Sequence, residues 1–227
     1  MNVLIVVAHL RKGGPVDVVF NLCRKIAERK DIRLSVVTLR KETNDSKLSD
    51  FTDLGIGVDS LDCSYLDCEL RTRVVARKLS EIVRQKKIDI VHCHTYHPVL
   101  MGAKLKGVKL VATLHNRADE DFVNVYGKIV GGYMIRRYYR ALRQFDENIA
   151  VSESAAEVYE RKLSNVSYVN NGVDVDKFSV ISREAQQQLR LKCYLPTQAI
   201  ILVSSGRIER EKRCEELLQW FSVFTHT

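Results

Sequence analysis

Short apolar runs rich in β-branched residues recur along the chain, and the segments between them carry apolar residues at helical spacing. Runs of this kind predict strands that are covered on both faces of a parallel sheet. The expected strands cover 3–8, 34–39, 57–61, 88–94, 110–114, 149–151 and 166–169. The expected helices cover 15–29, 70–85, 99–106, 129–145 and 153–163. Their alternation predicts an α/β fold with a doubly wound, parallel, Rossmann-like sheet.

After Asp174 the pattern relaxes into a polar, glutamine-rich stretch with a helical patch at 184–192. A further apolar run, Ile200 to Val203, ends in a glycine turn and precedes a charged helix start. The expected organisation is an amino-terminal domain, a connector, and the first strand and helix of a second, incomplete domain, over 1–175, 176–197 and 198–227. Because one strand and one helix cannot bury both faces of the strand, this end of the chain needs another surface to cover it.

Composition narrows the classes of function. The formal net charge of +8 favours an anionic partner. Nothing resembles a zinc finger, a helix-turn-helix or an RNA-binding aromatic motif, so no nucleic acid partner is expected. No apolar window is long enough to span a bilayer, and the start lacks the basic lead of a signal peptide, which predicts a cytoplasmic protein. The six cysteines show no C-x-x-C spacing and are expected to be reduced.

Glycines and cations lie where two of the strands are expected to end. Gly13 and Gly14 follow the first strand, and Gly206 follows a later one, with Arg207 and Lys212 close behind it. In an open α/β sheet, ligands bind at the carboxyl ends of strands, where a helix N-terminus offers N–H groups to an anion. The first glycine pair either eases a tight turn or lets a ligand approach, and its place at a strand end favours the ligand.

Histidines end two further strands. His115 follows the fifth expected strand and His94 ends the fourth, so both are expected at the ligand-binding edge of the sheet. Strand alternation puts His92 and His94 on one face, and only a bend would bring His97 to the same ion. No carboxylate lies in this cluster, so no metal site is expected.

Six short motifs, weak singly, occur together in one order. They are Gly13-Gly14, D-I-V-H-C-H at 89–94, T-L-H-N at 113–116, V-S-E-S at 151–154, N-N-G-V-D at 170–174 and G-R-I-E-R-E-K at 206–212. In this order and spacing they resemble the motifs of the retaining GT-B glycosyltransferases of family 4 (GT4). The resemblance covers essentially the whole chain. It implies a GT-B amino-terminal domain followed by the start of a truncated donor-binding domain.

The resemblance implies a donor site. Arg207 and Lys212 would hold the diphosphate of a nucleotide-sugar, and Gly13 and Gly14 would face the donor phosphates. No cofactor and no metal is implied beyond the nucleotide-sugar itself. The two glutamates in an E-x7-E arrangement that complete this site in the family have no counterpart here. The chain is therefore expected to be truncated, and inactive as it stands.

The resemblance also implies contacts to the sugar and the acceptor. His115 would approach the transferred sugar and is the catalytic candidate. The candidates on the acceptor side are His94 and Asn116. Ser152, where a strand meets a helix, is expected only to cap the helix.

A complete homologue would transfer a sugar from a nucleotide-sugar to a glycan or lipid-linked acceptor, in polysaccharide or glycoconjugate biosynthesis. Two other classes of function stay open. One is a non-catalytic, flavodoxin-like binding or regulatory module. The other is a relative of the nucleotide-sugar epimerases, to which GT-B folds are related.

The segment from Lys128 to Arg143 mixes arginines with aromatic and apolar side chains. Arg136, Arg137 and Arg140 are the candidates to face an anionic membrane surface. In that case the protein would dock reversibly on the inner face of the cytoplasmic membrane. Alternatively the segment is an ordinary amphipathic helix, with its apolar side in the core and its arginines in water.

Overall fold

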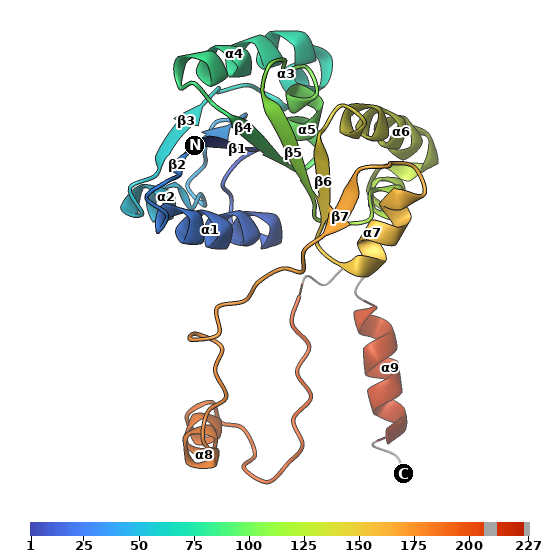
Figure 1. The fold of residues 1–227 in the computed structure, drawn as a ribbon. Helices are drawn as coiled ribbons and strands as arrows, with labels where there is room; N and C mark the ends of the chain where they lie inside the picture. The colour runs from blue at the N-terminus through green and yellow to red at the C-terminus, as the bar shows by residue number, and fades with distance from the viewer. Residues whose placement is uncertain (207–212, 225–227) are drawn as a thin grey trace. The chain divides into compact units, whose positions relative to one another are not determined.

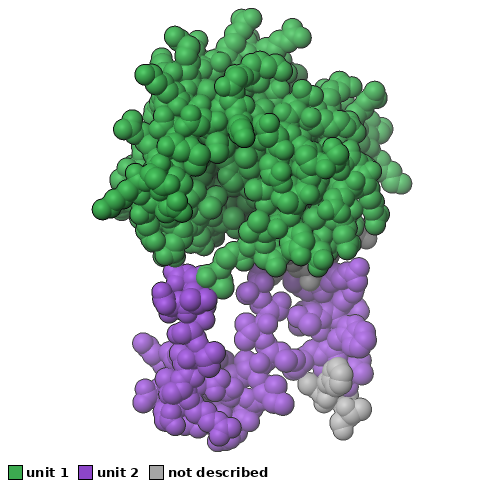
Figure 2. All heavy atoms as spheres, viewed as in Figure 1, with its two compact units in different colours: residues 1–173 green, residues 174–227 purple. Residues whose placement is uncertain are grey.

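The computed structural model of the chain describes residues 1–206 and 213–224. The chain divides into two compact units, residues 1–173 and residues 174–227 (Figure 2). The first unit contains a seven-stranded sheet in which every pairing is parallel (Figure 1). The expected α/β, Rossmann-like fold class is therefore confirmed.

The strands match the predicted apolar runs closely. They are β1 (Asn2–Val7), β2 (Arg33–Thr38), β3 (Gly57–Ser60), β4 (Ile90–His94), β5 (Lys109–Leu114), β6 (Glu147–Ala150) and β7 (Val166–Tyr168). Their order in the sheet is β3-β2-β1-β4-β5-β6-β7. The chain thus builds the sheet outward from β1 in one direction, and then returns to build it in the other direction from β4.

The helices of the first unit are α1 (Gly14–Ala27), α2 (Leu48–Asp53), α3 (Tyr65–Leu70), α4 (Thr72–Gln85), α5 (Tyr96–Gly102), α6 (Ala118–Leu142) and α7 (Glu153–Glu160). The second unit holds α8 (Arg183–Lys192) and α9 (Cys214–Phe224). The sequence pattern does not predict α2 and α3. Each is only six residues long, which is too short to show a helical period.

Each face of the sheet has its own hydrophobic core. Residues of β1 alternate between the two, since Leu4 and Val6 belong to one core and Ile5 and Val7 to the other. The larger core packs residues of α4, α5, α6 and α7 against the sheet, and the smaller core packs residues of α1 and α2. Cover on both faces explains why the strands read as continuous apolar runs.

The helix α6 is longer than expected and is kinked. The sequence pattern predicts only its second half, because Gly127 breaks the helix with a φ of 76°. A β carbon on Gly131 would overlap the main chain of Phe122 and would lie only 2.8 Å from the Cα of Val123. The two halves of α6 therefore approach so closely that only glycine fits at position 131.

We expect the Gly131→Ala variant to be destabilised by about 1–3 kcal/mol, the usual cost of forcing extra volume into a packed site. The neighbouring Gly132 is a matched control, because a β carbon there meets no atom within 4 Å. Gly132→Ala should be neutral, or more stable by about 0.5–1 kcal/mol, since alanine favours the helix. Urea unfolding of both variants tests the close approach. Equal stability of the two would contradict it.

The second unit contains helices and no strand among its described residues. The strand predicted from Ile200 to Val203 is not formed, and these two side chains are 92% and 84% exposed. A strand of this kind needs neighbouring strands in its own unit, and the described part of the unit offers none. The apolar side of α9 is also uncovered, with Trp220 69% exposed. Among the described helices, none combines the length and apolar content that crossing a bilayer requires.

Candidate functional site

The strand order reverses between β1 and β4, and the helices that follow these two strands pack on opposite faces of the sheet. A cavity of about 350 Å³ lies at this point. Its lining includes His9 and Gly13 from the loop after β1, and His94 at the end of β4. A slightly larger hollow of about 380 Å³ is lined by residues of α4, α5 and α6, away from the strand ends. In open parallel sheets, ligands bind at the point where the strand order reverses. The cavity of about 350 Å³ is therefore the candidate ligand site.

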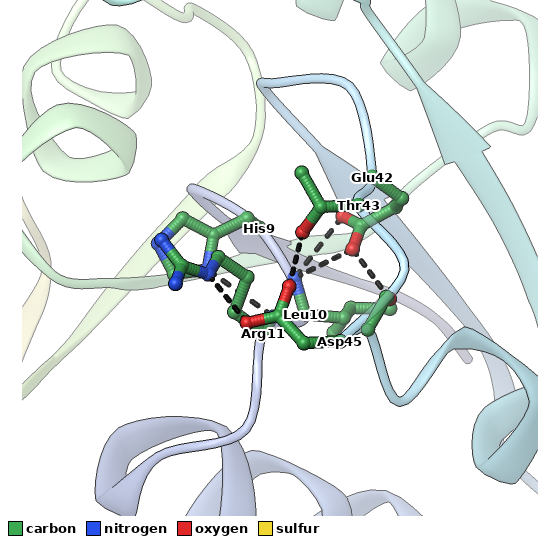
Figure 3. Close-up of polar contacts among 7 residues, drawn as sticks. His9, Leu10, Arg11, Glu42, Thr43 and Asp45 are labelled. Atoms are coloured by element: carbon green, nitrogen blue, oxygen red, sulfur yellow. Dashed lines mark hydrogen bonds and ion pairs between the residues drawn. The ribbon is translucent and has the colours of Figure 1, made fainter.

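The loop between β1 and α1 is held in place by the loop that follows β2 (Figure 3). The main-chain N–H of Leu10 donates to both carboxylate oxygens of Glu42, at 3.0 and 3.1 Å. Arg11 donates from Nε to a carboxylate oxygen of Asp45 at 2.9 Å, and Asp45 also accepts from the hydroxyl of Thr43. The main chain at this wall of the cavity therefore has a fixed course.

Gly13 and Gly14 stand at the end of this loop. Gly13 has an extended backbone, with φ 165° and ψ 160°, which any residue can adopt. A β carbon on Gly13 would meet no protein atom closer than 4.0 Å, and one on Gly14 would meet none within that distance. Neither local backbone strain nor packing among the described residues therefore demands glycine here, and the space beside both residues is open.

Three histidine rings lie in a row across β4 and β5. The rings of His92 and His94 have centroids 4.3 Å apart, and those of His94 and His115 are 5.2 Å apart. Nε2 of His92 is 2.7 Å from the hydroxyl oxygen of Thr113, and Nδ1 of His94 is 2.9 Å from Nε2 of His115. The structure thus brings together the two histidines that the sequence placed at strand ends.

Burial keeps these rings uncharged. It lowers the pKa of His115 to about 4. Burial, with a smaller contribution from the charge of His115, lowers the pKa of His92 to about 4. Burial and the two neighbouring rings hold the pKa of His94 well below its ordinary value. At neutral pH all three imidazoles are therefore neutral hydrogen-bonding groups.

The hydrogen bond between His94 and His115 could be donated by either ring. Nε2 of His94 is buried without a hydrogen-bond partner among the described residues. Buried N–H groups without an acceptor are rarer than buried acceptors without a donor. This places the proton of His94 on Nδ1 and makes His94 the donor. His115 then accepts at Nε2 and carries its own proton on Nδ1; it stands behind His94 and is not itself among the residues that line the cavity.

His97 belongs to a different group. Its Nε2 is 2.9 Å from a carboxylate oxygen of Glu69, and Arg137 pairs with the other oxygen of the same carboxylate. The side chain of Arg137 is only 20% exposed, so it is less available to a membrane surface than the exposed Arg136 and Arg140. The sequence alone does not distinguish Arg137 from the exposed Arg136 and Arg140. The difference comes from Glu69 on α3, whose carboxylate pairs with Arg137. Within the described part of the chain, no group of three or more side chains is placed to hold a metal ion.

The remaining candidates lie in separate places. Asn116 is exposed, and its carbonyl oxygen accepts a hydrogen bond from the hydroxyl of Tyr159 at 2.9 Å. Ser152 accepts from the main-chain N–H of Ala155 at 3.2 Å, so its predicted role as a helix cap is confirmed. Arg136 and Arg140 are exposed on α6. The candidates for the donor diphosphate, Arg207 and Lys212, lie outside the described residues.

The sequence reasoning missed several residues that line the cavity. Arg40 follows β2, and Tyr65, Phe122 and Tyr126 belong to α3 and the first half of α6. Arg40 could have been found, because it stands just beyond the end of the second predicted strand. The three aromatic residues could not, since they lie on helices that carry no clear periodic pattern.

The lowered pKa values of the histidines predict a specific sensitivity to acid. Below about pH 6.5 the unfolded chain binds protons at His92 and His115, whereas the folded protein does not do so until about pH 4. Stability is therefore full above pH 6.5 and falls as the pH drops toward 4. At about 1.4 kcal/mol per unit of pKa shift, we expect a loss of about 2 kcal/mol or more between pH 7 and pH 5.

Urea unfolding at the two pH values measures this loss. The His92→Gln variant is a matched comparison, because the amide can keep the bond to Thr113 but does not titrate. It should lose less stability than the native sequence over the same interval. The same pH dependence in both proteins would show that the His92 ring is not held neutral by the fold.

Comparison with known proteins adds a family. Residues 12–177 match the model of the family described as Glycosyltransferase Family 4. No curated protein sequence matches the chain. The matched segment contains the glycine pair at the end of the loop after β1, all three histidines in the row and all four aromatic residues of the cavity lining.

Solved structures resemble this one in fold. The sucrose-phosphate synthase of Thermosynechococcus elongatus has a TM-score of 0.75 at 14% identity, covering 97% of this chain and 59% of that one. The Anabaena protein HepE, in complex with UDP and glucose, has a TM-score of 0.65 at 14% identity, covering 86% and 50%. The UDP-GlcNAc 2-epimerase of Neisseria meningitidis, bound to UDP-GlcNAc, has a TM-score of 0.59 at 13% identity, covering 99% and 64%. The chain thus spans about half to two thirds of the length of these structures.

Proposed function

Since this chain belongs to Glycosyltransferase Family 4, we propose that it forms the acceptor-side half of an enzyme that transfers a sugar from a nucleotide-sugar to a hydroxyl group. The observation that carries this proposal is the cavity at the β1–β4 switch point, where the glycine loop and His94 meet. Open α/β sheets bind nucleotides and their substrates at such points. The family match favours sugar transfer over epimerisation, because the likeness to the epimerase concerns the fold alone.

The proposed donor is a nucleotide-sugar. Two of the similar structures contain UDP with glucose and UDP-GlcNAc, which makes a UDP-sugar the first donor to test. The open space beside Gly13 and Gly14, at the start of α1, supports the approach of donor phosphates to this loop. Arg207 and Lys212 keep their proposed role as cations on the diphosphate. The acceptor is proposed to be a glycan or a lipid-linked glycan, and no metal or cofactor is part of the proposal.

His115 is proposed to contact the transferred sugar. Its lowered pKa and its bond to His94 support a neutral ring that donates from Nδ1 to a sugar hydroxyl. A neutral donor orients the sugar without carrying charge, and its protonation state does not change near pH 7. His94 acts through His115, because it holds the tautomer and the orientation of that ring.

Two substitutions separate the two nitrogens of His115. In a glutamine side chain the amide reaches the position of Nε2, and in an asparagine side chain it reaches the position of Nδ1. His115→Gln should keep the bond to His94 and the stability, while turnover falls at least about tenfold, the equivalent of one lost hydrogen bond. His115→Asn should show the reverse, with turnover better preserved and stability lower.

The measurement uses a chimera that joins residues 1–173 to the donor-binding half of HepE, and it follows UDP released from UDP-glucose. The donor-binding half alone is the blank, and melting temperatures report stability. A folded chimera that releases no UDP above the blank would contradict the proposed function. Release that is equally fast in both His115 variants would contradict only the role of this ring.

Docking on a membrane surface is proposed through α6. Around the kink at Gly127, four apolar side chains are more than half exposed, which is unusual for a cluster on a water-facing helix: Val125, Ile129, Val130 and Tyr133. Arg136 and Arg140 are exposed on the same helix. Apolar side chains beside cations suit the boundary between lipid head groups and water. With Arg137 paired to Glu69, these two arginines carry the proposed contact to the inner face of the cytoplasmic membrane.

Co-sedimentation with phosphatidylglycerol vesicles tests this surface. A variant with Ile129→Asn, Arg136→Glu and Arg140→Glu should lose binding, since each basic residue near an anionic leaflet contributes about 1 kcal/mol. The control reverses the exposed Lys25 and Lys30, at the end of α1 and just after it, and should bind like the native chain. Equal loss of vesicle binding in both variants would show that binding depends only on the net charge of the protein. It would exclude α6 as the docking element.

A further inference from the structure

The lining of the cavity at the switch point carries an excess of positive charge. Three cations contribute to its wall, Arg11, Lys12 and Arg40, and its described lining contains no carboxylate. Arg11 is bound by Asp45, so its charge is partly compensated. The two remaining cations make the interior of the cavity attractive to an anion.

Arg40 has no ion-pair partner among the described residues. It stands two residues beyond β2, where its main-chain N–H donates to the carbonyl oxygen of Ala8 at 3.0 Å. Its side chain is half-buried, and its Nε is fully buried with no hydrogen-bond acceptor among the described residues. A buried guanidinium N–H without an acceptor is costly, and arginines in such places are normally paired. Arg137, for example, pairs with the carboxylate of Glu69.

The charge of Arg40 acts on the cavity wall. After burial, it is the largest influence that lowers the pKa of His9, another lining residue. It also contributes to the lowered pKa of His97, behind burial and against the opposing effect of Glu69. Two different walls of the cavity therefore lie within reach of this guanidinium.

Aromatic rings form another part of the cavity lining, called here the aromatic wall. They come from three helices: Tyr65 from α3, Tyr96 from α5, and Phe122 and Tyr126 from the first half of α6. Tyr96 and Phe122 pack edge to face with centroids 5.2 Å apart. Tyr65 and Tyr126 are 42% and 44% exposed, so their rings are open to a ligand. Rings of this kind bind the apolar face of a sugar or a hydrocarbon chain.

We propose that this cavity binds an acceptor with an anionic group, a phosphate or a carboxylate, which sits on Arg40 and Lys12 while its ring or chain packs on the aromatic wall. The proposal rests on the proposed function and narrows its substrate to anionic acceptors. The donor diphosphate is proposed to lie on Arg207, Lys212 and the glycine loop, which leaves Arg40 without a role toward the donor. A planar guanidinium can bind both oxygens of a phosphate or carboxylate at once.

Amide NMR titration of the chain with two matched pairs of probes tests the charge. Glucose 6-phosphate is compared with glucose, and geranyl phosphate with geraniol. At least one phosphate should bind about tenfold to hundredfold more tightly than its neutral twin, as a charge-assisted hydrogen bond predicts. The tighter of the two phosphates tells whether the acceptor is a sugar phosphate or a prenyl phosphate. Equal affinity within both pairs would overturn the proposal.

Substitutions locate the charge. Arg40→Gln should abolish the preference for the phosphate. Arg40→Lys keeps the positive charge and should retain part of the preference, which shows that the loss in Arg40→Gln is not caused by unfolding. Arg33 is the matched control, because it is an exposed arginine at the opposite, amino end of the same strand. Arg33→Gln should bind like the native chain. An unchanged preference in Arg40→Gln, with the melting temperature maintained, would overturn the role of Arg40.

Competition separates acceptor from donor. UDP should leave the Arg40-dependent binding of both probes in place, because the donor phosphates are proposed to lie on the glycine loop and the acceptor anion on Arg40. Displacement of the probes by UDP, with the same dependence on Arg40, would assign the cation to the donor and overturn the inference. The proposed glycosyltransferase would survive that result, since the HepE chimera measures UDP release, in which water takes the glucosyl group and no other acceptor is needed.

Discussion

In a sheet whose strands all run in one direction, every carboxyl end lies along the same edge, and only a reversal of strand order can open a space there. The reversal between β1 and β4 supplies it, because α1 packs on one face and α5 on the other. The residues that make up the candidate site in the first unit all lie near this reversal of strand order. The glycine loop leaves β1, the histidine row ends β4 and β5, and Arg40 leaves β2.

The ionisable groups of the site fall into two classes, histidines that are neutral and arginines that are charged. The histidines are kept uncharged by burial and are joined by hydrogen bonds, which fixes their tautomers at little electrostatic cost. The arginines cannot lose their charge, so they need partners. Arg137 has Glu69 and Arg11 has Asp45, and each pair also ties two segments of the fold together. Arg40 has no such partner among the described residues, which is why its position carries more information than that of an exposed arginine.

The sequence predicted the first unit well because its strands are buried on both faces, and a buried strand must be a continuous apolar run. It failed where an element is not defined by its own periodicity. The helix α6 is interrupted at Gly127, and α3 is too short to display a face. The run at Ile200 reads as a strand by composition, yet composition cannot supply the neighbouring strands that would pair with it.

The candidate site shows the same division. Strand ends can be read from the sequence, so His94 and His115 were found together with the glycine pair. Partners that come from distant elements cannot be read in this way. Glu69 on α3 turns Arg137 inward, a contact between residues 68 positions apart that no local pattern encodes. The aromatic wall likewise depends on a kink that brings Phe122 against the second half of its own helix.

The charge state of the histidines limits how the proposed reaction can work. Departure of a nucleoside diphosphate develops negative charge, and stabilising it requires cations or aligned N–H groups. His115, with a pKa of about 4, is neutral where the reaction would run and cannot supply that charge. Its proposed contribution is a hydrogen bond that holds the sugar. Stabilisation of the leaving group then falls to the amino end of α1 and to the cations proposed for the donor side, Arg207 and Lys212. Under this division, acceptor binding by Arg40 and leaving-group stabilisation use separate positive charges, so the two substrates do not compete for one cation.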